Sequence, residues 1–275
     1  MQKFEIFPGE SFYLNLHPEK EILSEIIREK GFYSYNDLYV FRKILSAGGV
    51  FVDVGANIGW HTISMASYLS EGQVIAFEPD VANFRLLEEN TKKNDFSNVI
   101  CAEKALSNYN GPGQLSLSGA NFGDHILDPT NLLDPRSKVR VDVVTGDSYF
   151  WNQENLKRMD LIKIDAQGSE CKILEGFKKI IQHYQPAIMI EYSPRHISAA
   201  GDSVFEIFAF IEKSGYFPFQ IVEDLDREPN RLLDFVSIEN LLSATKVLME
   251  RGTGVDLLLL KPQQIEHLQR QGFVL

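Results

Sequence analysis

Short apolar runs alternate with longer amphipathic segments in the first half of the chain, beginning at residue 50. The apolar runs have the length of buried strands, and the segments between them carry apolar residues at helical spacing. Strand and helix in alternation predict a parallel sheet with helices on both faces, which is a doubly wound α/β fold. The expected strands lie at 50–54, 74–77 and 99–105, and the expected helices at 58–69 and 81–93.

The alternation resumes after a polar break at 107–136, which is rich in Gly, Asn, Asp and Pro. A short hairpin is expected around Gln114 to Ser118. A loop this long is unusual inside a domain unless it has a role, so we expect the segment to cover a site. The last two apolar runs are expected to pair antiparallel at the sheet edge. The later strands are expected at 139–144, 161–164, 187–191, 217–222 and 255–260, with helices at 169–182 and 204–214.

Two segments with helical spacing, 19–30 and 36–46, precede the alternating series. They predict that residues 1–47 form an N-terminal helical cap and that residues 48–275 form the main domain. Glycines 48 and 49 mark the boundary between the two parts.

The composition argues against duplex nucleic acid as a partner. The chain has 38 acidic and 27 basic residues and a net charge of -11, and such a surface repels the phosphates of duplex nucleic acid. Its two cysteines are too few for a disulfide framework or a cysteine zinc site, and no spacing of histidines and acids resembles a metal site. We expect neither a leader peptide nor a membrane-spanning segment, and therefore a cytoplasmic protein with no membrane partner.

The sequence FVDVGANIG links the first strand of the series to the following helix. Gly55 allows a tight turn, Gly59 allows the helix start to pack closely, and the amides at that helix start are expected to be free for a ligand. A nicotinamide dinucleotide site would need a glycine where Asn57 stands, so that the pyrophosphate meets bare backbone. Asp53 at the strand end would repel pyrophosphate but would accept a hydrogen bond from an ammonium group. S-adenosylmethionine carries that ammonium group and no phosphate.

A second acidic residue ends the next strand in the sequence AFEP. Glu78 lies about twenty residues beyond the glycine turn, where an acid of nucleoside-binding sheets bonds the ribose hydroxyls, and Pro79 stops the strand. The two strand-end acids and the turn predict a site for S-adenosylmethionine. The expected cofactor-binding residues are Asp53, Gly55, Ala56, Asn57, Gly59, Glu78 and Pro79.

The sequences FVDVGANIG, AFEP, LIKIDAQGSE and MIEY resemble those of the FkbM-type family, a branch of the class I S-adenosylmethionine-dependent methyltransferases. The resemblance runs from about Val50 to about Tyr192. It implies the class I fold, with a mostly parallel seven-stranded sheet, an antiparallel edge strand, and a cofactor bound by the first motif and Glu78. Known members mostly methylate hydroxyl oxygens of sugars or natural products, which implies a small-molecule or carbohydrate acceptor. Gln167 stands where the family usually has a Glu, so no acid/base role is expected there.

Methylation of a hydroxyl requires a group that removes its proton. Asp165 and Glu191 end two of the expected strands, at the edge where open α/β sheets bind ligands, so either is a candidate general base. Lys163 shares a face of its strand with Asp165 and is expected to pair with one of these acids. The expected catalytic residues are Asp165, Glu191 and Lys163, with His125 and His196 as alternative bases.

Two other functions are compatible with these residues. An NAD-dependent oxidoreductase would share the fold but is disfavoured by Asn57. A non-catalytic module that binds S-adenosylmethionine is favoured by Gln167 and disfavoured by the intact acids. The sequence leaves open the acceptor, oxygen or nitrogen as the methylated atom, the assistance of a metal, and the oligomeric state.

Overall fold

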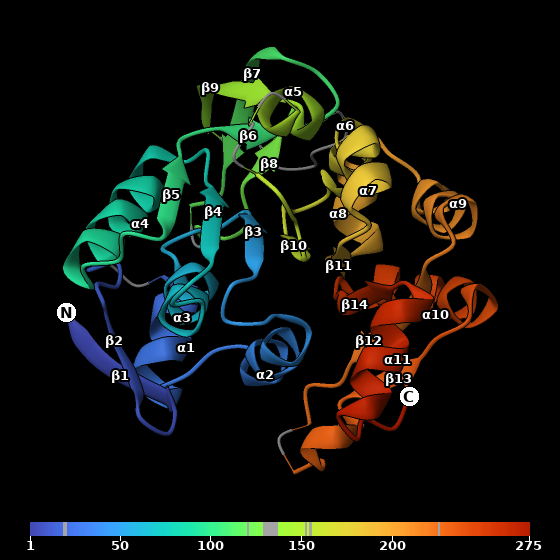
Figure 1. Ribbon diagram of the computed structural model, residues 1–275. Helices are drawn as coiled ribbons and strands as arrows, with labels where there is room; N and C mark the ends of the chain where they lie inside the picture. The colour runs from blue at the N-terminus through green and yellow to red at the C-terminus, as the bar shows by residue number, and fades with distance from the viewer. Residues whose placement is uncertain (19–20, 120, 129–136, 152, 154–155, 225) are drawn as a thin grey trace.

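The computed structural model describes residues 1–275 except 19–20, 120, 129–136, 152, 154–155 and 225. The described residues form an α/β fold around an eight-stranded sheet with the strand order β13-β12-β14-β11-β10-β3-β4-β5 (Figure 1). The strands are β3 (Val50–Val54), β4 (Gln73–Phe77), β5 (Val99–Ala102), β10 (Leu161–Ile164), β11 (Ala187–Tyr192), β12 (Phe217–Ile221), β13 (Leu233–Phe235) and β14 (Val255–Leu260).

Five neighbouring strands, from β11 to β5, run parallel. β14 runs antiparallel to β11 on one side and to β12 on the other, and β13 pairs antiparallel with β12 at the edge. The predicted doubly wound class I fold is confirmed, as is the antiparallel pairing of the last two predicted strands. The sheet has eight strands instead of seven because the short β13 lies in a polar segment with no strand pattern, and β13 instead of β14 forms the edge.

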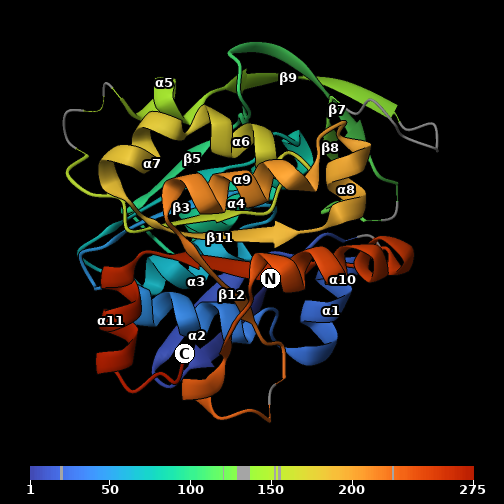
Figure 2. The same cartoon turned by 90° about the vertical axis from the view of Figure 1, so that its right-hand side faces the viewer.

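The central strands are apolar on both faces, as parallel strands covered by helices must be. Every residue of β3 and β10 is buried. Val50 and Val52 belong to one apolar core, whereas Phe51 between them belongs to the other. The sheet is therefore the middle of three layers, as Figure 2 shows.

Helices cover both faces of the sheet. One core packs it against α5 (Gly146–Phe150), α6 (Glu170–Gly176), α7 (Lys178–Tyr184), α8 (Pro194–Ala199), α9 (Val204–Ser214) and α10 (Ile238–Arg251). The other core packs it against α1 (Ile22–Lys30), α2 (Tyr35–Ile44), α3 (Trp60–Tyr68) and α11 (Pro262–Arg270). A smaller cluster packs α4 (Val81–Lys93) against β4. The helix predicted at 169–182 is two helices, α6 and α7, separated by Phe177.

The N-terminal segment begins with a β-hairpin that the helical pattern did not predict. β1 (Gln2–Phe7) and β2 (Glu10–Leu14) pair antiparallel around Gly9, whose φ is 81°. Phe4 and Phe12 of the hairpin pack edge-on against Trp60 at the start of α3. The two predicted cap helices are present as α1 and α2, and the whole segment shares one apolar core with the sheet.

A second, four-stranded sheet lies beyond the main one, at the top of Figure 1, with the order β6-β9-β7-β8. Its strands are β6 (Ala105–Leu106), β7 (Gly111–Leu117), β8 (Ile126–Leu127) and β9 (Ser137–Val144). The strand predicted at 139–144 thus belongs to this sheet and not to the central one. Two strands, β7 and β8, lie in the segment predicted to cover a site. Residues 120 and 129–136 of that segment lie outside the described residues.

Three further observations bear on the composition. No described helix is long and apolar enough to cross a membrane. Cys101 and Cys171 are both free thiols, the first half-buried and the second buried. Within the described ranges, no three His, Cys, Asp or Glu side chains are placed to hold a metal ion.

Candidate functional site

The glycine turn after β3 contains three residues with left-handed backbone. Gly55, Asn57 and Gly59 have φ values of 77°, 51° and 94°. A methyl group at Gly55 would lie 1.9 Å from the carbonyl oxygen of Asp165, so only glycine lets the ends of β3 and β10 come this close. Asn57 tolerates its conformation because its side-chain Oδ1 accepts a hydrogen bond from the Ile58 amide at 2.7 Å.

Three amides of this turn, which precede the start of α3 at Trp60, are bonded within the chain. The Asn57 amide donates to Glu78 Oε2 at 2.7 Å, and the Gly59 amide donates to the Ala56 carbonyl at 2.9 Å. With the Ile58 amide bonded to Asn57 Oδ1, all three are satisfied within the chain. The turn can therefore offer a ligand close backbone approach, but not these three donors.

Glu78 follows β4 and joins the turn to the start of α4. Besides the Asn57 amide it accepts a hydrogen bond from the Asp80 amide at 2.9 Å. Its side chain is only 5% exposed, and this burial raises the pKa of Glu78 to about 7. Each carboxyl oxygen keeps a further lone pair, and the residue lines a cavity, so it can still accept hydrogen bonds from a ligand.

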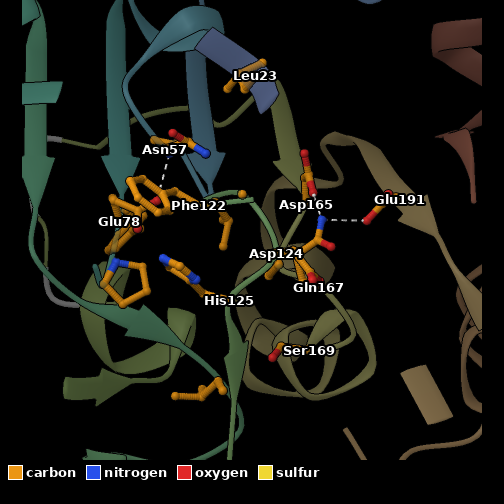
Figure 3. A pocket seen from close by; sticks show the side chains of 18 of the residues that line it. Leu23, Asn57, Glu78, Phe122, Asp124, His125, Asp165, Gln167, Ser169 and Glu191 are labelled. Atoms are coloured by element: carbon orange, nitrogen blue, oxygen red, sulfur yellow. Dashed lines mark hydrogen bonds between the residues drawn. The ribbon is translucent and has the colours of Figure 1, made fainter. Parts of the chain in front are cut away.

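The first cavity lies at the carboxyl ends of β3, β4 and β10 and measures about 430 Å³, within the usual range for small-molecule sites. Figure 3 shows Asn57, Glu78 and Phe122 on one side of it and Asp165, Gln167 and Ser169 on the other. Asp53 and Gly59 do not line it. The predicted cofactor and catalytic residues that do are Gly55, Ala56, Asn57, Glu78, Pro79, Lys163, Asp165 and Glu191.

Gln167 joins the two predicted bases. Its Nε2 donates to Asp165 Oδ1 at 2.9 Å and to Glu191 Oε2 at 3.0 Å (Figure 3). A glutamate at this position would bring a third negative charge beside two others, whereas the amide supplies donors to both. Gln167 is therefore a positioning residue for the acids, a role that the sequence analysis did not assign to it.

Lys163 lies on the cavity wall, between the carboxyl groups of Asp53 and Asp165. Its Nζ is 3.4 Å from Asp53 Oδ1 and 3.4 Å from Asp165 Oδ2, and its side chain is 3% exposed. Burial lowers the pKa of Lys163, but the attraction of Asp165 and Asp53 outweighs burial and leaves the pKa above its usual value. Asp53 is fully buried and also accepts a hydrogen bond from the Thr62 hydroxyl at 2.7 Å. The Asp53 carboxylate thus contacts Lys163 and Thr62 and does not line the cavity.

Glu191 differs from Asp165 in its electrostatic surroundings. Burial raises the pKa of Glu191 well above its usual value, and neighbouring carboxylates, that of Asp165 first, raise it further. Asp256 lies directly opposite Glu191 on the antiparallel neighbour β14. Lys163 and Gln167 both contact the Asp165 carboxyl group, whereas the carboxyl groups around Glu191 disfavour its charged form, so Asp165 is the better candidate base.

A second cavity of about 360 Å³ adjoins the first and extends toward α2 and β14. The two cavities share part of their walls, including Lys163 and the carboxyl groups of Asp165 and Glu191. Tyr33 and His61 also line both cavities. Tyr33 lies between α1 and α2, in a segment whose sequence carries no signal for a site.

Three histidines line the first cavity, and His61 is the one that also lines the second. His61 is 6% exposed, and burial lowers its pKa well below the usual value, so the ring is neutral at neutral pH. The two histidines predicted as alternative bases each have a partner: His125 Nδ1 accepts from the Ser118 amide at 3.0 Å, and His196 Nε2 lies 3.4 Å from Asp124 Oδ1.

Residues 53–218 match the Methyltransferase FkbM domain, which covers more than half of the chain and contains both the glycine turn and the predicted bases. This chain belongs to the FkbM methyltransferase family. The family predicted from the sequence is confirmed, and the match speaks against the alternative of an NAD-dependent oxidoreductase. The methyl donor predicted from the glycine turn, S-adenosylmethionine, is the cofactor of this class.

The FkbM chain is 28% identical over 141 residues to Methyltransferase 1 of Beauveria bassiana and 27% identical over 154 residues to Methyltransferase sdnD of Sordaria araneosa. Each alignment covers 46% of this chain, but 57% and 59% of the relatives, so the chain matches little more than half of their length. Among solved structures, Methyltransferase FkbM from Methylobacillus flagellatus KT aligns with a TM-score of 0.48 at 16% identity, over 78% of this chain and 44% of that one. A putative O-methyltransferase from Klebsiella pneumoniae aligns with a TM-score of 0.46 at 14% identity, over 90% and 92%.

The first cavity of this FkbM chain fits a nucleoside cofactor. Glu78 presents two carboxyl oxygens there, which suits a ribose diol. The Ser169 hydroxyl is buried at the same cavity and has no hydrogen-bond partner among the described residues. A buried hydroxyl without a partner is costly, and a polar ligand would supply the missing hydrogen bond.

Proposed function

We propose that this methyltransferase transfers a methyl group to a hydroxyl oxygen of a small molecule, a sugar or a natural product. The proposal rests on one observation: the two adjoining cavities share the wall that carries Asp165. In this arrangement the first cavity holds S-adenosylmethionine and the second holds the acceptor. The family assignment supports methyl transfer, and the choice of oxygen follows from a carboxylate on the shared wall that can take a proton.

The chain would bind the cofactor along the carboxyl ends of β3 and β4. Glu78 accepts hydrogen bonds from the ribose hydroxyls, Gly55 and Ala56 allow the backbone to approach, and Ser169 offers its hydroxyl. When bound, the cofactor supplies a methyl group made electrophilic by its attachment to a sulfonium. The chain itself has only to hold, align and deprotonate the acceptor.

Asp165 is the base in this proposal. Lys163 and Gln167 fix its two oxygens from different sides and leave the carboxylate on the shared wall. In the transfer an acceptor oxygen forms a bond to the methyl carbon, and the carbon–sulfur bond breaks with its electron pair staying on sulfur. The hydroxyl proton goes to Asp165, so charge and atoms balance.

The reaction is tested with cofactor that carries a ¹³C label in its methyl group and a panel of hydroxylated small molecules. We expect a labelled product whose carbon chemical shift is that of a methyl group on oxygen. A methyl group on nitrogen in every product would contradict the choice of oxygen. Tight cofactor binding without release of S-adenosylhomocysteine from any mixture would favour the non-catalytic module instead.

Replacing Glu78 by Ala is expected to weaken binding of S-adenosylhomocysteine by about 1.5–3 kcal/mol, the usual contribution of hydrogen bonds to a charged group. Isothermal titration calorimetry measures the change. Because Glu78 also accepts from two backbone amides, thermal unfolding of the variant must show that the turn is intact. The matched control is Glu103→Gln, an exposed acid just after β5, which should bind the product as the parent does. If Glu78→Ala binds S-adenosylhomocysteine as tightly as the parent, Glu78 does not contact the cofactor.

A further inference from the structure

Carboxyl groups from three separate elements meet in the second cavity. Asp37 lies in the first turn of α2, Asp256 in β14, and Glu223 shortly after β12. Asp165 and Glu191 of the shared wall face the same space. Because Asp256 and Glu191 are direct neighbours across two antiparallel strands, like charges stand opposite one another there.

The described lining of this cavity carries five carboxyl groups and two lysines, Lys30 and Lys163. Among the residues that the structure describes, no lysine or arginine forms an ion pair with Asp37, Glu223 or Asp256. Lys163 is already shared by Asp53 and Asp165. Burial raises the pKa of Asp37 to about 7, and burial followed by the Asp37 charge raises that of Asp256 well above its usual value. Negative charge here is costly until a cation arrives to offset it.

His61 gives a second and independent indication of a ligand. It lies in the first turn of α3, more than nine-tenths buried, and lines the second cavity as well as the first. Its Nε2 has no hydrogen-bond partner among the described residues, and the nearest acid oxygen, Asp37 Oδ2, is 3.9 Å away. A neutral ring nitrogen that is buried beside a cavity and has no hydrogen bond within the chain is expected to form one with a bound ligand.

We propose that the second cavity binds the acceptor through a positively charged amine, which Asp37, Glu223 and Asp256 hold while Asp165 meets the hydroxyl. The acceptors are then hydroxylated amines, such as amino sugars and amino alcohols. This inference rests on the proposed function, because it assigns the acceptor to the second cavity. A cavity of about 360 Å³ with acids spread over its wall has room for a molecule of this size.

The first test compares binding of two matched pairs of probes. Glucosamine and ethanolamine carry the amine, and N-acetylglucosamine and N-acetylethanolamine keep the hydroxyls but lose the charge. Calorimetry is done on the full chain saturated with S-adenosylhomocysteine, with EDTA present. We expect each amine to bind about 10-fold to 100-fold more tightly than its N-acetyl partner. Equal or tighter binding of the N-acetyl forms, no saturable binding of either amine, or amine binding that requires added Mg²⁺ would each overturn the proposal.

The second test removes single charges from the wall. Glu223→Gln changes an exposed side chain and should not affect folding, and Asp256→Asn replaces a carboxyl group by an amide of the same shape. Asp256→Asn should weaken binding of the amines about 10-fold or more and Glu223→Gln by less, because the Glu223 side chain is exposed, and both should leave the N-acetyl probes unaffected. Glu212→Gln, an exposed acid on α9 away from the cavity, is the matched control and should bind as the parent does. Amine affinity that survives both wall substitutions would contradict the assignment.

The two proposals fail in distinguishable ways. If the amines bind as expected but no probe is methylated on oxygen, the proposed reaction is wrong and the amine site stands. If neutral hydroxyl compounds are methylated and the amines neither bind nor react, the reaction stands and the amine site is wrong.

Discussion

Replacing Asp165 by Asn is expected to lower kcat for methyl transfer by about 10²–10⁴-fold, the usual contribution of a general base. A hydroxyl is a poor nucleophile while it keeps its proton, and an amide cannot take that proton. The fold should survive, because Lys163 retains Asp53 as an ion-pair partner at 3.4 Å. The measurement is release of S-adenosylhomocysteine per folded molecule, with calorimetry to confirm that the product still binds.

Glu191→Gln is the matched control for that substitution. Glu191 lies on the same wall and accepts a hydrogen bond from Gln167, as Asp165 does, but burial and neighbouring carboxylates raise its pKa and disfavour its charged form. A glutamine there keeps the shape and an acceptor oxygen, so kcat should stay within a few-fold of the parent. If Glu191→Gln loses most of its kcat and Asp165→Asn loses none, Glu191 is the base and Asp165 is not. Parent rates in both variants would leave proton removal to a histidine, with His61 on the shared wall as the next group to replace.

Much of the fold follows from sequence patterns because the central strands are buried on both faces. The bounds of β3, β10 and β14 agree with prediction, since each is an unbroken or nearly unbroken apolar run. β13 and the N-terminal hairpin were missed for the opposite reason. β13 has three residues, two of them exposed, and the hairpin's alternation of exposed and buried residues is interrupted by a bulge between Glu5 and Phe7.

The site could be predicted only as far as local sequence determines it. The glycine turn and Glu78 are adjacent to their own strands, so the pattern places them at the cavity. The predicted pairing of Lys163 with Asp165, on the same strand, is confirmed. Its second partner depends on which strands are neighbours, and a single sequence does not contain that information. In the structure β10 pairs with β3 so that Lys163 lies directly opposite Asp53. Because of this pairing, the Asp53 carboxylate contacts Lys163 and does not line the cavity, although its position at the strand end had predicted a contact with the cofactor.

The same pairing makes Lys163 a second position with a large expected effect. Replacing Lys163 by Met should lower the free energy of unfolding by about 3–5 kcal/mol, the usual cost of removing one partner from a buried ion pair. The side chain is 3% exposed, so water cannot replace the lost ammonium. Asp53 would keep only the hydroxyl of Thr62, and its Oδ1 would have no partner among the described residues. Urea unfolding followed by circular dichroism measures the loss.

The double variant Lys163→Met/Asp53→Asn separates the ion pair from simple packing. Removing the orphaned charge together with the ammonium should recover a large part of the lost stability, with a coupling of about 0.5–3 kcal/mol between the two positions.

The recovered protein also tests whether Lys163 acts on catalysis through Asp165. Loss of the ammonium that lies 3.4 Å from Asp165 Oδ2 should lower kcat of the double variant, because the Asp165 carboxyl group loses one of the two groups that fix its position. A double variant no more stable than Lys163→Met alone would mean that Lys163 supports the fold by packing and not by charge. A kcat equal to that of the parent would limit Lys163 to holding β3 and β10 together.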